Sequence, residues 1–165
     1  MAADCLRSSP VPGEREDDHI RGDGPLVLLY ADFACPRCAV AWARLDGAPV
    51  RLVFRHLALR AKHPRAVALA CAAEAAARQG AFWPWAEALY ADQAHVDDPH
   101  LWALVTRLGL DLGRWEADRR SDAVTARVTG DVRDALRGGA VATPTLFARG
   151  AMLAGPPDDA WLAAL

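Results

Sequence analysis

Two cysteines separated by two residues are the feature of this chain that could do chemistry. Cys35 and Cys38 enclose Pro36 and Arg37 within the stretch "YADFACPRCAVAW", residues 30–42. A pair at this spacing can ligate a metal, form a structural disulfide, or exchange electrons with other thiols. The flanking residues and the distant parts of the chain must decide among these three chemistries.

The residues around the pair predict a helix that begins at Cys35 or Pro36, because proline is favoured in a first helical turn. A cysteine at a helix N-terminus faces unpaired backbone N–H groups and the positive end of the helix dipole, which both favour thiolate. Cys35 is therefore the candidate nucleophile, and Cys38, one turn later and facing inward, is the candidate resolving thiol. Arg37 adds a cation close to the thiolate. Asp32 either relays protons for Cys38 or caps the turn after the preceding strand.

A zinc site at the pair would need two further ligands, and the rest of the sequence does not supply them in a usual pattern. Cys71 stands alone in an alanine-rich segment, and Cys5 lies near the N-terminus. His56 and His63 fall outside the usual three-to-five spacing of paired histidine ligands. We therefore expect no metal. His63 is expected to be structural at a helix start, Cys71 a small buried hydrophobe, and Cys5 an exposed thiol.

Length and composition indicate one domain with an ample core. The chain has 165 residues, of which 53% are hydrophobic, and a net charge of −2. That charge gives no reason to expect nucleic acid or an acidic membrane surface as a partner. The first 25 residues contain no apolar run typical of a signal peptide, and no stretch could span a bilayer. We therefore expect a cytoplasmic protein, where thiols are kept reduced and a structural disulfide is disfavoured.

The pattern of elements predicts an α/β fold. A buried strand over 26–30, the helix from Cys35 or Pro36, and a strand over 50–56 form a crossover unit. This unit places the thiols just past the C-terminal end of a strand. Helical patterns follow, then a long helix from about 121 to 138, a hairpin over 143–155 and a last helix over 158–165. The expected parts are a polar N-terminal arm (1–24), an α/β sandwich (25–61 and 121–165) and an inserted helical subdomain (62–120).

Several segments, taken in order, resemble the DsbA-like branch of the thioredoxin superfamily. "YADFACPRC" is similar to the strand and active-site segment of that branch. "KHPRAVALACAAEAAARQGAFWPWAEALY" resembles its inserted helices. "GLDLGRWEAD" and "VTGDVRDALRGGAVATPTLFARG" resemble the downstream helices and the loop before the closing hairpin. Together these segments cover about residues 18–165.

The resemblance implies a thioredoxin fold (β-α-β, inserted helices, β-β-α) and thiol-disulfide exchange through Cys35 and Cys38 without a cofactor. It implies that Pro144 is a cis-proline opposite the cysteines, and that Thr143 presents its backbone to an extended substrate. The implied substrates are protein or small-molecule thiols and disulfides, and a further redox partner is implied as well. The chain is expected to be a monomer or a dimer. Two residues depart from the family pattern: Arg37 replaces a histidine, and Ala142 stands where glycine is frequent.

Two other functions are compatible with the sequence. Related folds act as glutathione-dependent isomerases or transferases, which commonly carry a serine where Cys35 stands. Alternatively, the chain could be a redox-responsive binding module without turnover. Direction of electron flow and substrate are left open by the sequence.

Overall fold

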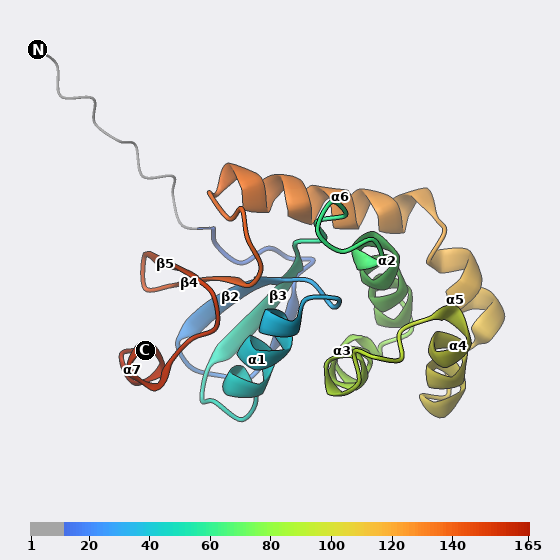
Figure 1. Ribbon diagram of the computed structural model, residues 1–165, viewed down its shortest axis with the longest axis horizontal. Helices are drawn as coiled ribbons and strands as arrows, with labels where there is room; N and C mark the ends of the chain where they lie inside the picture. The colour runs from blue at the N-terminus through green and yellow to red at the C-terminus, as the bar shows by residue number, and fades with distance from the viewer. Residues whose placement is uncertain (1–11) are drawn as a thin grey trace, which may run out of the picture.

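A mixed five-stranded sheet forms the centre of the computed structural model, which describes residues 12–165 (Figure 1). The strand order is β1-β3-β2-β4-β5. β2 runs parallel to β3, and the other neighbouring pairs are antiparallel. The strands are β1 (His19–Arg21), β2 (Leu26–Ala31), β3 (Arg51–His56), β4 (Thr145–Ala148) and β5 (Ala151–Ala154).

Seven helices lie within the described residues and follow the predicted order. They are α1 (Pro36–Leu45), α2 (Ala66–Ala77), α3 (Phe82–Ala91), α4 (Asp98–Arg107), α5 (Leu112–Asp118), α6 (Asp122–Arg137) and α7 (Asp159–Ala163). The predicted start of α1 at Cys35 or Pro36 is confirmed, since the helix begins at Pro36 with Cys35 as its N-cap. In the described part of the chain, no helix combines the length and the apolar character that crossing a bilayer requires.

β2 is the central strand of the sheet and is covered by side chains on both faces. Val27 and Leu29 belong to the larger hydrophobic cluster, which also contains residues of α1, α2 and α3. Leu28 and Tyr30 belong to a second cluster with Ala135 of α6. Alternate residues of a strand point to opposite faces, so the unbroken apolar run "LVLLY" matches a strand that is buried on both faces of the sheet. Figure 1 shows α6 on one side of the sheet and α1 and α3 on the other.

Part of the segment expected to be a loosely held arm instead joins the sheet. Residues 19–21 form β1, which pairs antiparallel with β3 at the sheet edge. Just before it, the carboxylate of Asp18 accepts two hydrogen bonds of 2.7 Å from Arg55 of β3. Both side chains are almost fully buried. The sequence missed this strand because it is short and polar, and because Arg55 is distant in the chain. The division into a sandwich and an inserted subdomain stays a prediction.

Candidate active site

Cys35 lies at the junction between the central strand and α1. It is the N-cap residue of that helix, with extended backbone angles (φ −89°, ψ 119°), and no side chain caps the helix. Its carbonyl accepts hydrogen bonds from the backbone N–H groups of Cys38 and Ala39. The expected placement of a thiol at the helix N-terminus is therefore present, and Pro36 occupies the first turn because its missing N–H is no loss there.

The Cys35 thiol is acidic. A hydrogen bond from the side chain of Cys38 contributes most to lowering the pKa of Cys35 to about 5, against an opposing effect of burial. A side-chain hydrogen bond with Thr143 and the backbone N–H groups of Cys38 and Arg37 lower the pKa further. Hydrogen bonds of this kind stabilise a thiolate more than a neutral thiol. Cys35 is a free thiol in this structure, so these contacts belong to the reduced state.

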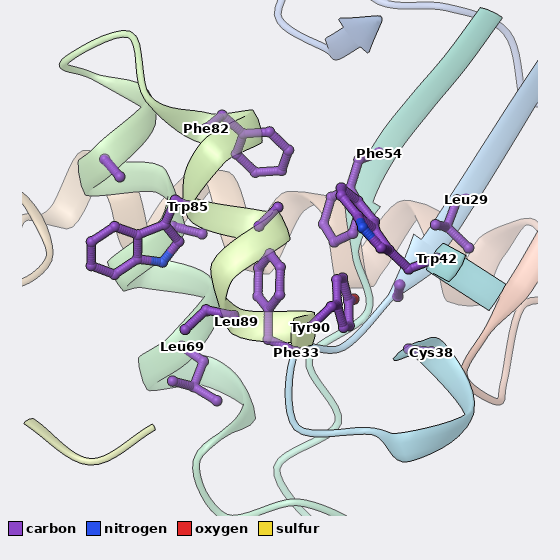
Figure 2. Close-up of a cluster of buried hydrophobic side chains, with 14 of the residues drawn as sticks. Leu29, Phe33, Cys38, Trp42, Phe54, Leu69, Phe82, Trp85, Leu89 and Tyr90 are labelled. Carbon is purple, nitrogen blue, oxygen red and sulfur yellow. The ribbon is translucent and has the colours of Figure 1, made fainter. Parts of the chain in front are cut away.

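Cys38 has the opposite environment. Its side chain is fully buried in the larger hydrophobic cluster, together with Phe33, Trp42 and Tyr90 (Figure 2). Burial, followed by the hydrogen bond with Cys35, raises the pKa of Cys38 well above its ordinary value. The backbone N–H of Asp32 donates to the Cys38 sulfur at 3.4 Å. The two thiols therefore differ sharply in acidity although only two residues separate them.

The loop before β4 lies against the cysteines. The peptide bond between Thr143 and Pro144 is cis. The Cys35 thiol lies 3.6 Å from the carbonyl oxygen of Thr143, to which it can donate. The loop is held in place from two sides: the Gly155 N–H donates to the Pro144 carbonyl at 2.8 Å, and the Thr145 hydroxyl donates to the Ala142 carbonyl at 2.6 Å. More than a hundred residues of sequence separate the two halves of this site.

Asp32 is buried beside the cysteines and makes two contacts through its carboxylate. Oδ1 accepts a 2.8 Å hydrogen bond from the Ala34 N–H, which caps the turn after β2. Oδ2 lies 2.8 Å from Nδ1 of His63. Burial raises the pKa of Asp32, although the Ala34 N–H and His63 oppose that shift. The capping role considered for Asp32 is thus observed, and His63, expected to be only structural, reaches the same carboxylate.

Arg37 contributes to the site through its backbone. Its N–H is among the hydrogen bonds that lower the pKa of Cys35. Its guanidinium lies against Gly155, where a Cβ atom would come within 2.7 Å of Nη2. The side chain is therefore directed toward the loop that follows β5. The role of this guanidinium as a cation close to the thiolate stays a prediction.

Tyr90 of α3 and Gln93, just after that helix, support the active-site segment, and the sequence predicted neither role. Nε2 of Gln93 donates to the carbonyl oxygens of Phe33 at 2.7 Å and Cys35 at 3.1 Å. Tyr90 packs against Phe33 and Trp42, and its buried hydroxyl has no hydrogen-bond partner in the described part of the chain. No local pattern marks either residue, since glutamine and tyrosine near a helix end are common. Of the remaining cysteines, Cys71 is buried as predicted, and Cys5 lies outside the described residues.

Comparison with known proteins identifies relatives of this chain. The family model described as "DSBA-like thioredoxin domain" matches residues 47–163, which begin after the two cysteines. Among curated proteins, a Na(+)/H(+) antiporter NhaA of Herminiimonas arsenicoxydans is 42% identical over 156 residues, covering 89% of this chain and 25% of the antiporter. An NhaA 1 of Mycolicibacterium vanbaalenii is 40% identical over 92% of this chain and 26% of its own length. The chain thus spans about a quarter of the length of these relatives.

Solved structures share the fold over nearly the full chain. A thioredoxin-like oxidoreductase from Silicibacter pomeroyi superposes with a TM-score of 0.81 at 23% identity, covering 91% of this chain and 90% of that one. Pseudomonas aeruginosa DsbA2 has a TM-score of 0.73 at 28% identity, covering 92% and 94% of the two chains. Wolbachia pipientis alpha-DsbA1 has a TM-score of 0.75 at 16% identity, covering 92% and 89%. The predicted thioredoxin fold with additional helices is confirmed by these likenesses.

Proposed function

Because this chain belongs to the DsbA-like family of thioredoxin-fold thiol-disulfide oxidoreductases, we propose that it exchanges disulfides through Cys35 and Cys38. Its substrates are protein or small-molecule thiols and disulfides, and a separate redox partner resets the pair. No metal or organic cofactor takes part in the exchange.

The main support for this proposal is the difference in acidity between the two thiols. The pKa of Cys35 falls to about 5, so this residue is largely thiolate at neutral pH, whereas burial raises the pKa of Cys38 and keeps it a thiol. Thiolate is the attacking species in thiol-disulfide exchange. An exchange reaction needs one thiol that attacks first and a second thiol that stays protonated until it resolves the intermediate. Cys35 and Cys38 match these two roles.

The reaction proceeds by two exchanges of sulfur bonds. The Cys35 thiolate attacks a substrate disulfide, forms a mixed disulfide and releases one substrate thiolate. Cys38 then loses its proton and attacks the Cys35 sulfur, which forms the Cys35–Cys38 disulfide and releases the second substrate thiolate. The substrate gains two electrons and the pair loses two. The same steps in reverse oxidise a dithiol substrate.

Asp32 serves as the acceptor for the Cys38 proton. Its buried carboxylate has a raised pKa, which brings its basicity closer to what proton transfer near neutral pH requires. Its backbone N–H already donates to the Cys38 sulfur and stabilises the charge that develops there. His63 contacts the same carboxylate from a position that is 27% exposed. The proton can therefore pass from Asp32 to solvent by way of His63.

The loop at Thr143 and Pro144 receives the substrate chain. Thr143 precedes β4, so its backbone lies beyond the paired part of that strand. An extended peptide can add to a free backbone edge of this kind by main-chain hydrogen bonds. Its disulfide would then lie beside Cys35, whose sulfur is 3.6 Å from the Thr143 carbonyl.

Turnover assays with matched cysteine variants test the function. Purified chain should reduce insulin disulfides with a thiol reductant and oxidise a reduced, unfolded protein in a glutathione buffer, with many turnovers in each case. Cys35→Ser should abolish both reactions, whereas Cys38→Ser should accumulate a mixed disulfide with substrate. Cys71→Ser serves as the control and should behave as the parent. Unchanged turnover in Cys35→Ser would refute the proposed role of the pair and favour a glutathione-dependent transferase.

A second candidate is a redox-responsive module that acts on a Na(+)/H(+) antiporter. The observation that favours it is the 42% identity to one quarter of an NhaA antiporter. In that case the redox state of Cys35 and Cys38 would change binding to the antiporter without multiple turnovers. The insulin assay separates the candidates, because a module without catalysis would react only once per chain.

A further inference from the structure

Three side chains from three different elements meet at one point outside the cysteine site. Nε2 of His19, from β1, lies 2.6 Å from Oε1 of Glu74 in α2. Nε2 of His56, at the end of β3, lies 2.7 Å from the same oxygen. All three atoms lie within 4.8 Å of one another. Each of these side chains directs a metal-ligating atom toward its two neighbours.

The negative charge of the buried Glu74 carboxylate needs a positive partner within this cluster. Glu74 is 7% exposed. Within the described residues its ion-pair partners are the two histidines, and no lysine or arginine contacts it. A buried carboxylate requires a positive partner or a metal ion to offset the loss of hydration. Either a proton on the imidazoles or a bound cation can meet this requirement.

We propose that His19, His56 and Glu74 form a binding site for a divalent transition metal, with zinc as the best match. Two imidazole nitrogens and one carboxylate are a known zinc donor set that leaves a fourth position for water. The side chain of His19 is 14% exposed, so water and the ion can reach the cluster from that side. The three ligand atoms need only small side-chain shifts to surround an ion at about 2.0–2.2 Å.

Aromatic residues hold the two histidines in place. The ring of Phe82 stacks on His19 with centroids 3.7 Å apart. The rings of Phe54 and Phe33 lie 5.4 and 6.0 Å from that of His56. An apolar shell of this kind limits access of solvent to a metal. Nδ1 of His56 has no hydrogen-bond partner among the described residues, whereas zinc-bound histidines usually donate from the ring nitrogen that does not bind the metal. We therefore expect weaker binding than at a site whose outer partners are complete.

The metal would fasten the edge of the sheet to the helical layer. β1 has three residues, and among residues 12–165 it pairs only with β3. A shared ion would link β1 to the end of β3 and to α2. The sequence does not indicate this site, because the three ligands are far apart in the chain and His63, the histidine that follows His56, contacts Asp32 instead.

Metal titration of a chain without reactive thiols tests the proposal. Cys5, Cys35 and Cys38 are replaced by serine, because thiolates would bind zinc themselves. Calorimetry with zinc chloride should then show one ion per chain, and Co²⁺ should give the visible absorption of a tetrahedral site. His19→Gln and Glu74→Gln should each weaken binding at least tenfold. His95→Gln is the matched control, because His95 contacts Asp92 at 2.8 Å on the surface, and it should bind as the parent does.

Thermal unfolding gives a second readout. Zinc should raise the melting temperature of the parent with the three serine substitutions and of His95→Gln in that background, and EDTA should reverse this effect. His19→Gln should show no such rise. If Glu74→Gln does not fold, His19→Gln decides, because this residue lies on the sheet edge. Absence of saturable binding in the parent, or equal binding in His19→Gln, would overturn the proposal. Since the experiment uses a chain without the redox cysteines, its result is independent of the proposed exchange reaction.

Discussion

Nδ1 of His63 lies 2.8 Å from Oδ2 of Asp32, and the two residues connect the buried cysteine to the surface. The Asp32 side chain is inaccessible, whereas that of His63 is 27% exposed. The charge of Cys35 raises the pKa of Asp32, and the charges of Cys38, Asp32 and Cys35 add to the raised pKa of the neighbouring Tyr90. The proposed acceptor for the Cys38 proton thus has a connection to solvent through His63.

Substitution of Asp32 should slow the second exchange step and leave the first unchanged. In Asp32→Asn the acceptor for the Cys38 proton is lost, so resolution of the mixed disulfide should fall at least tenfold, since general-base catalysis contributes about 10²–10⁴. A chromogenic aromatic disulfide separates the steps, because attack and resolution each release one coloured thiolate. Equal resolution rates in Asp32→Asn and the parent would contradict the assigned role.

Substitution of His63 should move the pH profile of the same step. His63 lowers the pKa of Asp32, so His63→Gln should raise it further and shift the rise of the resolution rate to higher pH. The first thiolate release, measured in the same traces, should keep its profile. A purely structural His63 would lower the rate at every pH without displacing the midpoint.

Alkylation of Cys35 should report a strongly acidic thiol. The rate of reaction with iodoacetamide should rise with a midpoint near pH 5, where the pKa of Cys35 lies. Cys38→Ala should move this midpoint upward, because the hydrogen bond from Cys38 is the largest contribution to the shift. Mass spectrometry should show Cys71 unmodified, since burial raises the pKa of that thiol. A midpoint near the ordinary thiol value of about 8.5 would refute the acidity argument.

The reduced chain should owe part of its stability to the Cys35 thiolate. The pKa of Cys35 is depressed on folding, so this contribution is complete above the unfolded pKa and is lost as pH falls toward about 5. Compared with Cys35→Ser, the reduced parent should gain up to about 1.4 kcal/mol per pH unit over this interval. Urea denaturation at pH 4, 6 and 8 measures the difference. A difference that does not change with pH would show that the thiolate does not stabilise the fold.

The same stabilisation should make the disulfide form oxidising. Because a stable thiolate favours the reduced pair, the reduction potential should lie nearer to the roughly −120 mV of a strong oxidant than to the roughly −270 mV of thioredoxin. Equilibration with glutathione buffers measures this value. A potential near that of thioredoxin would indicate that other interactions stabilise the oxidised form by a comparable amount.

Gln93, which follows α3, should stabilise the active-site segment. Gln93→Ala removes two hydrogen bonds to backbone carbonyls and should cost about 1–3 kcal/mol of unfolding free energy. It should also change the alkylation rate of Cys35, whose carbonyl is one of the acceptors. Gln79 is a matched control, because it also makes two hydrogen bonds to one backbone segment, at Asp111. Gln79→Ala should reduce stability without affecting Cys35, and an equal effect of both variants on alkylation would exclude a specific role for Gln93.

Local rules were sufficient to predict much of the active site. The apolar run over 26–30 predicted the central strand, and Pro36 predicted where α1 begins. Since a cysteine at a helix N-terminus meets unpaired N–H groups, the acidic thiol could be assigned to Cys35. The position of Cys38 one turn later placed it on the buried face. Each of these inferences depends on residues within a few positions of one another.

Contacts between distant residues could not be predicted in this way. The sequence of β1 carries no strand pattern, yet pairing with β3 and the ion pair of Asp18 with Arg55 hold this segment on the sheet. Gln93 reaches the carbonyl of Phe33 across sixty positions. The cis peptide before Pro144 was expected from family resemblance, and no local pattern required it.

The sequence by itself therefore determined which residues can react, because helix starts, buried strands and thiol spacing are local properties. The tertiary structure decided what surrounds them. It brought His63 to Asp32 and Thr143 to Cys35, and it turned the Arg37 guanidinium toward Gly155. Burial and hydrogen bonding set the acidity of a thiol, and both arise only when segments far apart in the chain pack together.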